Sequence, residues 1–198
     1  SSINVRKVVW TLQALGLPFV RTDAGLAYGI VKTPKYLQQN PNALVPLLDD
    51  DGFTLWESNV IVRYLCARHS HGDLYPDDLQ ARFDAERWMD WEQTTMNSAG
   101  RAAFIQWVRT PVERRQPGVI AESVAAMEPL LAMVDSQLAQ RPFMAGDHLT
   151  MADIPIACEI HRWWGLPQPR APWPNIERWY QGLLAHPASH GIFDVPST

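Results

Sequence analysis

The chain has 198 residues, of which 46% are hydrophobic and 19% charged, with a formal net charge of −4. This length allows one or two compact domains with a sizeable core, and the acidic balance argues against nucleic acid or an anionic membrane as the main partner. The sequence has no evident signal peptide, no apolar run near the ~20 residues of a membrane helix and no disulfide framework. We therefore expect a cytoplasmic protein.

The chain is expected to begin with a helix. Apolar residues recur at helical spacing from Val5 to Leu15, and Gly16 is a candidate C-cap. A strand is predicted over Phe19–Thr22. Because a helix in an α/β domain normally crosses between two parallel strands, we expect another strand of about 5–6 residues to precede residue 1.

The next segments predict a short helix, a β-hairpin and a third helix. Thr33-Pro34 supplies an N-cap and a first helical residue, and this helix is expected to end near Asn40. Residues 45–49 and 53–56 flank an Asp-Gly turn, which is typical of a hairpin. Ser58 then begins a helix. Its expected buried residues are Val60, Ile61, Tyr64 and Leu65.

The second half of the chain is predicted to be all helical. The segment 69–76 reads as a linker, so we expect one domain over residues 1–70, a linker over 71–78 and a helical domain over 79–198. Helices are expected from Leu79 to about Asn97, along the apolar stripe from Ile120 to Leu138, from Leu149 onward, and over residues 176–183. Thr150 to Asp153 has the form of a capping box, for which we expect a purely structural role.

Glu57 and Ser58 stand where the third helix begins, just after the hairpin. Free amides and a hydroxyl at a helix N-terminus capture an anion without a basic side chain. An acidic neighbour selects an anion that also carries an ammonium group. A small zwitterionic peptide fits this description better than a phosphate does.

The segments around this helix start resemble a known family. Asn-Pro-Asn-Ala-Leu-Val-Pro-Leu at 40–47, Trp-Glu-Ser-Asn at 56–59 and Tyr-Leu at 64–65 resemble the glutathione-binding half of glutathione S-transferases. The resemblance covers almost the whole chain. It implies the fold of that family, which combines an α/β thioredoxin-like N-terminal domain, here with its first strand missing from the chain, with an all-α C-terminal domain.

The resemblance also implies roles for individual residues. Val45 and Pro46 would form a cis peptide that presents the Val45 backbone to the cysteinyl part of glutathione. Glu57 would meet the ammonium of the γ-glutamyl end and Ser58 its carboxylate, with Asn59 as an additional candidate. The structural alternatives are an N-cap role for Ser58 and a helix-dipole partner role for Glu57.

Thiol activation is expected at the start of the first helix. Lowering a thiol pKa by about two units from ~8.5 requires roughly 2.7 kcal/mol, and one hydrogen bond to a charged group supplies ~1.5–3 kcal/mol. The resemblance to serine-type members implies Ser2 as the principal thiol donor and Asn4 as a second polarising group. Ser1, a residue upstream of the chain, or a plain N-cap role for Ser2 are the alternatives.

The glycine end of glutathione has no evident partner in the sequence. Many relatives place His, Lys or Gln just before the Val/Ile-Pro pair, where this chain has Ala43 and Leu44. Either Lys32, Gln38 or Gln39 takes that role, or the glycine end is loosely held.

The sequence therefore predicts a glutathione transferase. Glutathione is the expected cosubstrate, a small hydrophobic electrophile or a disulfide its co-reactant, and a homodimer the expected assembly, with no metal. Cys66 and Cys158 are interpreted as buried inert thiols. Two alternatives stay open: a glutathione-dependent disulfide reductase, which asparagine-bearing relatives favour, and a non-catalytic or regulatory glutathione-binding protein.

Overall fold

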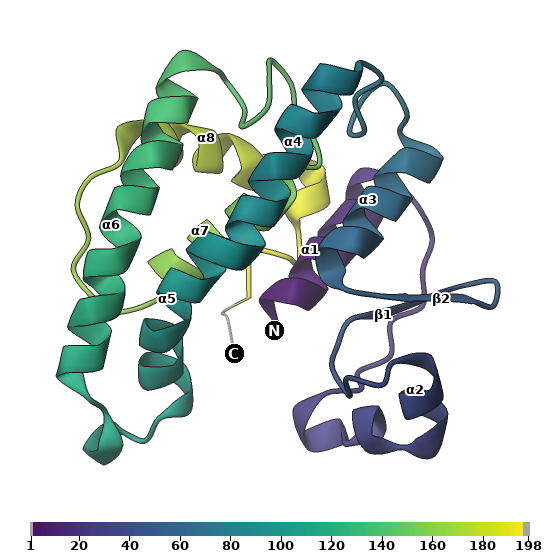
Figure 1. Cartoon of the computed structure of the whole chain (residues 1–198), viewed down its shortest axis with the longest axis horizontal. Coiled ribbons are helices and arrows are strands. Elements are labelled where there is room, and N and C mark those ends of the chain that lie inside the picture. Colours follow the sequence, from purple (N-terminus) through teal and green to yellow (C-terminus); the bar gives the residue numbers. More distant parts are fainter. Residues whose placement is uncertain (1, 196–198) are drawn as a thin grey trace.

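The structure, a computed structural model, describes residues 2–195. Its N-terminal part contains α1 (Ile3–Ala14), α2 (Pro34–Gln39), β1 (Leu47–Asp50), β2 (Phe53–Trp56) and α3 (Ser58–His69). The remainder contains α4 (Leu79–Trp91), α5 (Asn97–Phe104), α6 (Pro117–Gln140), α7 (Asp153–Trp164) and α8 (Pro174–Leu184). In Figure 1 the hairpin and α2 lie at one end of the molecule and α6 at the other. The domain limits at residues 70 and 79 stay a prediction.

The predicted hairpin is formed by β1 and β2. Leu47 pairs with Trp56 and Asp50 with Phe53 in an antiparallel register. The turn residues Asp51 and Gly52 both have positive φ, 52° and 90°, as a type I′ turn requires. The first strand begins two residues later than predicted, so that Pro46, which has no N–H to donate, lies outside it.

The predicted strand at Phe19–Thr22 is wrong. Residues 17–24 are irregular, and Val20 is 95% exposed. A strand requires backbone hydrogen bonds to a neighbour, and the sheet of the described residues holds β1 and β2 alone. The aromatic and β-branched composition of residues 19–22 was therefore not sufficient to predict a strand.

The third predicted helix, α3, begins at Ser58 as expected. Its buried apolar face consists of Ile61, Val62, Leu65 and Cys66. Val60 was predicted to be buried but is 42% exposed, because it lies outside the arc that these i, i+3 and i+4 positions share.

The helix predicted to end near Asn97 continues to residue 109. Two π-helical turns, Glu92–Met96 and Ile105–Arg109, interrupt it, one before and one after α5. A π turn inserts an extra residue and rotates the face that follows. Glu92 and Met96 are both fully buried at the first of these turns, so a charged side chain enters the core there.

The apolar stripe predicted for residues 120–138 is confirmed in α6. Ile120, Met127, Leu131, Val134 and Leu138 are buried. By length and composition alone α6 is long and apolar enough to cross a membrane. The expectation that the chain holds no apolar run near the length of a membrane helix is therefore wrong. In this fold α6 packs against α5 and α8.

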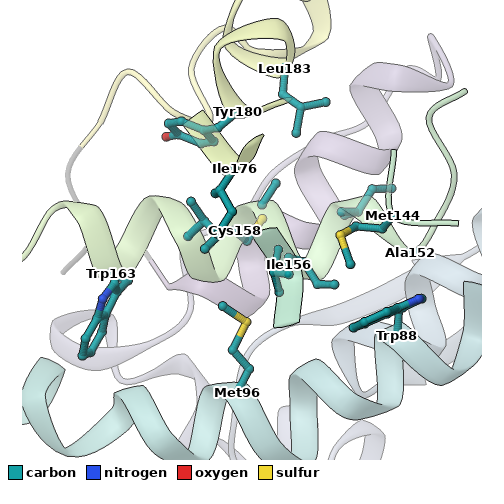
Figure 2. Packing of buried hydrophobic residues seen from close by; sticks show 14 of the residues in the cluster. Trp88, Met96, Met144, Ala152, Ile156, Cys158, Trp163, Ile176, Tyr180 and Leu183 are labelled. Carbon is teal, nitrogen blue, oxygen red and sulfur yellow. The ribbon is translucent and has the colours of Figure 1, made fainter. Parts of the chain in front are cut away.

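α7 is the central helix of the C-terminal part. Figure 2 shows Ile156 and Cys158 of α7 with Met96 on one side and Ile176 and Tyr180 on the other. The predicted capping box is formed in part: the Thr150 N–H donates to the Asp153 carboxylate at 3.0 Å, but the Thr150 hydroxyl accepts from the Ala152 N–H, and the Asp153 N–H donates to the Thr150 carbonyl instead. The carboxylate also accepts from the Met144 N–H at 2.9 Å and from Trp179 Nε1 at 3.0 Å. The Asp153 carboxylate therefore links the start of α7 to the loop at Met144 and to Trp179 of α8.

Two buried cations connect α1 to the helical part. The Lys7 ammonium donates to the Glu92 carboxylate, and the Arg6 guanidinium donates to the backbone carbonyls of Ile192 and Val195. Both side chains are almost fully buried. They fix the helix whose first turn follows Ser2.

Candidate functional site

A cavity of about 50 Å³ lies where the first turn of α1, the loop before the hairpin and the start of α3 meet. Five of the predicted site residues line it: Asn4, Val45, Pro46, Glu57 and Ser58. Ser2 is not among the lining residues. The cavity is smaller than the ~300–1,000 Å³ of typical ligand pockets, so a tripeptide would lie across it rather than inside it.

Ser2 occupies the N-cap position of α1. Its carbonyl accepts the first intrahelical bond from the Arg6 N–H at 3.0 Å, but its side chain makes no capping hydrogen bond. The hydroxyl is therefore not used as a cap, the alternative weighed above. Its role as thiol donor stays a prediction, and Ser1 lies outside the described residues.

Asn4 lies in the first turn of α1 and faces the cavity. Its Oδ1 atom is buried and has no hydrogen-bond partner among the described residues. A buried polar atom without a partner costs about 1–3 kcal/mol. Asn4 thus offers an amide that a ligand can satisfy.

The loop that carries Val45 is held in place from α2. The Val45-Pro46 peptide is cis, as the family resemblance implied. The preceding carbonyl, that of Leu44, accepts from the Tyr36 hydroxyl at 2.6 Å and from Asn40 Nδ2 at 2.8 Å. Burial raises the pKa of Tyr36, so the phenol stays a hydrogen-bond donor.

Asn40 and Asn42 are site residues that sequence reasoning missed. Both line the cavity. Asn40 is buried, and its Oδ1 accepts from the backbone N–H and the side-chain Nδ2 of Asn42, both at 3.1 Å. The Asn-Pro-Asn run was visible as part of the family resemblance, but its first residue was interpreted only as a helix end.

Glu57 and Ser58 form the start of α3. Glu57 is the N-cap residue, with φ of 72° and no side-chain capping bond. A non-glycine residue in this left-handed region costs about 1–3 kcal/mol and is often found at functional sites. Ser58 is the first helical residue rather than the N-cap, and its side chain is buried.

The electrostatics at the start of α3 suit a zwitterionic ligand. The first N–H groups of a helix have no intrahelical partners and carry partial positive charge. The exposed Glu57 carboxylate lies beside them. An ammonium and a carboxylate on one carbon can therefore both find partners here.

Other residues considered above lie elsewhere. Lys32, Gln38 and Gln39 do not line the cavity. Asn59 donates from Nδ2 to the Met89 carbonyl at 2.8 Å, so it ties α3 to α4. Both cysteines are buried, and burial raises the pKa of Cys66 and of Cys158 to about 12, which agrees with their interpretation as inert thiols.

Comparisons with known proteins identify the family. The model for the glutathione S-transferase N-terminal domain matches residues 1–68, and that for the C-terminal domain matches residues 117–182. Glutathione S-transferase GstB of Escherichia coli K12 is 40% identical over 198 residues, which cover 99% of this chain and 95% of the relative. The chain belongs to the glutathione S-transferase family.

Solved structures agree with this assignment. A theta class glutathione S-transferase from Xanthomonas axonopodis pv. citri, crystallised with glutathione bound, has a TM-score of 0.94 and 38% identity, covering 99% of this chain and 95% of that one. An epsilon-class enzyme from the housefly, Musca domestica, has a TM-score of 0.82 and 26% identity, covering 96% and 87%. The predicted family and fold are thus confirmed, whereas the roles of single residues stay predictions.

Proposed function

We propose that this glutathione S-transferase family member binds glutathione across the cavity and activates its thiol for attack on a small hydrophobic electrophile. One observation carries the proposal: Asn4, Val45 and the Glu57-Ser58 pair come from three separate segments and line one cavity. Each supplies a group that a different part of glutathione requires.

The γ-glutamyl end would bind at the start of α3. Its ammonium pairs with the exposed Glu57 carboxylate, and its carboxylate accepts from the Ser58 hydroxyl and the free amides of the helix N-terminus. The cysteinyl backbone pairs with the Val45 N–H and C=O, as a short strand would. The thiol then points toward the start of α1.

Ser2 and Asn4 would stabilise the thiolate. Lowering the thiol pKa by about two units needs roughly 2.7 kcal/mol, which one or two hydrogen bonds to a charged sulfur supply at ~1.5–3 kcal/mol each. The Ser2 hydroxyl makes no capping bond. Asn4 would donate to the sulfur from Nδ2, with its amide oriented so that Nδ2, and not the buried Oδ1 acceptor, faces the thiolate. The thiolate attacks the electrophilic carbon, and the leaving group departs.

The pH–rate profile of glutathione conjugation to chlorodinitrobenzene tests the thiol assignment. Ser2→Ala should raise the apparent pKa of bound glutathione by about one to two units, and Asn4→Ala should raise it less. Ser136→Ala, on the exposed surface of α6, is the matched control and should leave the profile unchanged. Profiles that match the wild type in both site variants would overturn the assignment.

Glutathione-dependent disulfide reduction is the second candidate. It is favoured by one observation: the asparagine of α1, and not the serine, lines the cavity. The thiolate would attack a disulfide sulfur, release one thiol and form a mixed disulfide, which a second glutathione resolves. Turnover of hydroxyethyl disulfide well above conjugation of chlorodinitrobenzene would decide for this reaction.

We further propose a cytoplasmic homodimer with a role in detoxification. Large apolar side chains are exposed on β2, α3 and α4, including Phe53 at 51%, Val60 at 42% and Phe83 at 59%. A second copy would remove such side chains from water. Light scattering of the wild type and of Phe83→Glu tests this, since a dimer that buries Phe83 should dissociate in the variant.

A further inference from the structure

We propose that the C-terminal segment, residues 189–195, positions the first turn of α1 for thiol activation, with Arg6 and Phe193 as positioning residues. Neither of these two residues lines the cavity. The inference rests on the proposed function, because it assigns to the activating turn a support that lies outside the glutathione site.

The first turn of α1 lacks the local contacts that usually fix the start of a helix. The Ser2 side chain makes no capping hydrogen bond, and no acidic residue lies in the first turn. A side-chain cap or an acidic residue stabilises this end of a helix, because the first N–H groups have no intrahelical acceptor. The position of the turn therefore depends on contacts with other parts of the chain.

Arg6 provides such a contact. Its backbone N–H donates to the Ser2 carbonyl at 3.0 Å, and its guanidinium donates to the carbonyls of Ile192 and Val195. The Arg6 side chain is buried. Arg6 thus connects the residue that we propose as thiol donor to backbone atoms 186 and 189 positions further along the chain.

Two further contacts extend the segment along the same side of α1. The Phe193 ring packs edge-on against Trp10, with the ring centroids 5.0 Å apart, and Gln13 Nε2 donates to the His190 carbonyl at 3.0 Å. Positions 6, 10 and 13 are spaced i, i+4 and i+7, which places them on one side of a helix. Figure 1 shows the yellow C-terminal segment beside α1.

The segment is in turn held by the helical part. The backbone N–H groups of Ile192 and Phe193 donate to the Ser189 carbonyl at 3.0 and 3.3 Å. The Phe193 ring also contacts His161 of α7 and Tyr180 of α8, with centroid distances of 5.2 and 5.7 Å. The contacts to α1 therefore come from a turn that α7 and α8 hold in place.

This support should act on thiol activation rather than on glutathione binding. Val45, Glu57 and Ser58, which we propose to bind the peptide, lie in the loop before the hairpin and at the start of α3. Loosening the segment would let the first turn of α1 move away from the sulfur while these groups stay in place. Because a hydrogen bond weakens steeply with distance and angle, such a movement raises the pKa of the bound thiol.

Titration of the glutathione complex with pH, followed by the ultraviolet absorbance of the thiolate, measures this pKa for either candidate reaction. Phe193→Ala removes the ring contact with Trp10 without changing any charge. It should raise the thiol pKa by about 0.5–1 unit, which lowers the thiolate fraction about 3- to 10-fold at a pH below the pKa. Arg6→Lys keeps the positive charge but loses the fork that reaches two carbonyls, so it should shift the pKa in the same direction.

Calorimetry on the same variants separates activation from binding. At a pH below the pKa of the bound thiol, the dissociation constants for glutathione should stay within about 2-fold of the wild-type value. A loss of the whole site would instead weaken binding and activation together.

Two further variants separate positioning from a general loss of stability. Phe193→Leu keeps an apolar side chain against Trp10 and should recover part of the pKa shift. Leu131→Ala creates a cavity in α6, where Leu131 is fully buried. It should lower the melting temperature to a degree comparable with Phe193→Ala but leave the thiol pKa unchanged.

The outcomes distinguish this inference from the proposed function. Absence of glutathione binding to the wild type contradicts the proposed function and this inference with it. Glutathione binding with an unshifted thiol pKa in Phe193→Ala or in Arg6→Lys leaves the glutathione site standing and overturns the positioning role. An equal pKa shift in Leu131→Ala would also overturn it, as would a Phe193→Ala protein whose affinity for glutathione falls about 10-fold or more.

Discussion

The ammonium of Lys7 lies 2.7 Å from the carboxylate of Glu92, and both side chains are completely buried. The same ammonium donates to Gln93 Oε1 at 3.2 Å. Lys7 lies one turn after Asn4 on α1, whereas Glu92 begins the π-helical turn after α4. The pair therefore joins the helix that starts at the cavity to the helical part of the fold.

Removing one partner of this pair should destabilise the protein strongly. Lys7→Met leaves a buried carboxylate without compensation and should lower the free energy of unfolding by about 3–5 kcal/mol. The double variant Lys7→Met/Glu92→Leu removes both charges and should recover most of this loss. Urea unfolding measures all three proteins.

A surface pair provides the control for this experiment. Arg87, whose side chain is 68% exposed, pairs with Asp84 on α4, and Arg87→Met should cost less than ~1 kcal/mol. A Lys7→Met effect of that small size, or a double variant as unstable as the single one, would contradict the account of the buried pair.

His161 gives the fold a pH dependence. Burial, and then the nearby Arg6 guanidinium, lowers the pKa of His161 to about 4. The ring lies 2.7 Å from the Tyr180 hydroxyl through Nδ1 and 3.2 Å from the Val195 carbonyl through Nε2. A neutral imidazole satisfies both contacts, with Nε2–H donating to the carbonyl and Nδ1 accepting from the phenol.

Stability should therefore fall as the solution is acidified. Below pH ~6.5 the unfolded chain binds a proton at this histidine, whereas the folded chain does not until about pH 4. The contribution of neutral His161 to the free energy of unfolding is fully present above pH ~6.5 and is lost between pH ~6.5 and about pH 4. Allowing for the partial exposure of the ring, we expect a loss of about 1–2 kcal/mol.

Urea unfolding from about pH 7.5 to about pH 4.5 measures this slope. The matched variant His161→Gln keeps a neutral donor and acceptor and does not titrate, so its free energy of unfolding should change less over this interval. Equal slopes in the two proteins would rule out His161 as the source.

Gly100 occupies a position on α5 where a side chain would force its neighbours to move. A Cβ atom there would lie 2.7 Å from Met127 Cε and 2.8 Å from Glu159 Oε1, and Glu159 is held in a buried ion pair with Arg162. Gly100→Ala should therefore cost about 1–3 kcal/mol through overpacking.

Gly182→Ala is the matched helical control. A Cβ atom at Gly182, in α8, would meet nothing within 4 Å, so alanine should stabilise the protein by up to ~1 kcal/mol. Thermal unfolding compares the two variants. A Gly100→Ala protein as stable as the wild type would contradict the packing described for α5.

Local patterns in the sequence identified most helices and the hairpin. The Asp51-Gly52 turn and the stripe from Ile120 to Leu138 carry their own signals, because turn φ values and helical periodicity are local properties. The strand expected at Phe19–Thr22 failed, because pairing depends on a neighbour that composition does not reveal. Lys7 is an ordinary polar residue in the sequence, and its burial depends on a carboxylate 85 positions away.

The candidate site was predictable to a similar degree. Glu57 and Ser58 follow the hairpin at a helix start, so their convergence with Val45 could be anticipated from the family resemblance. Asn40 and Asn42 could not, because their place in the site depends on hydrogen bonds within the loop that ends at the Leu44 carbonyl.

Calorimetric titration of glutathione into the full-length protein and its Glu57→Ala variant tests the central claim most directly. The account predicts saturable binding to the wild type and at least ~10-fold weaker binding to the variant, because the ammonium of the γ-glutamyl end loses its charged partner. Glu122→Ala, on the exposed face of α6, should bind as the wild type does. Absence of binding to the wild type, or equal affinity in Glu57→Ala, would contradict the account.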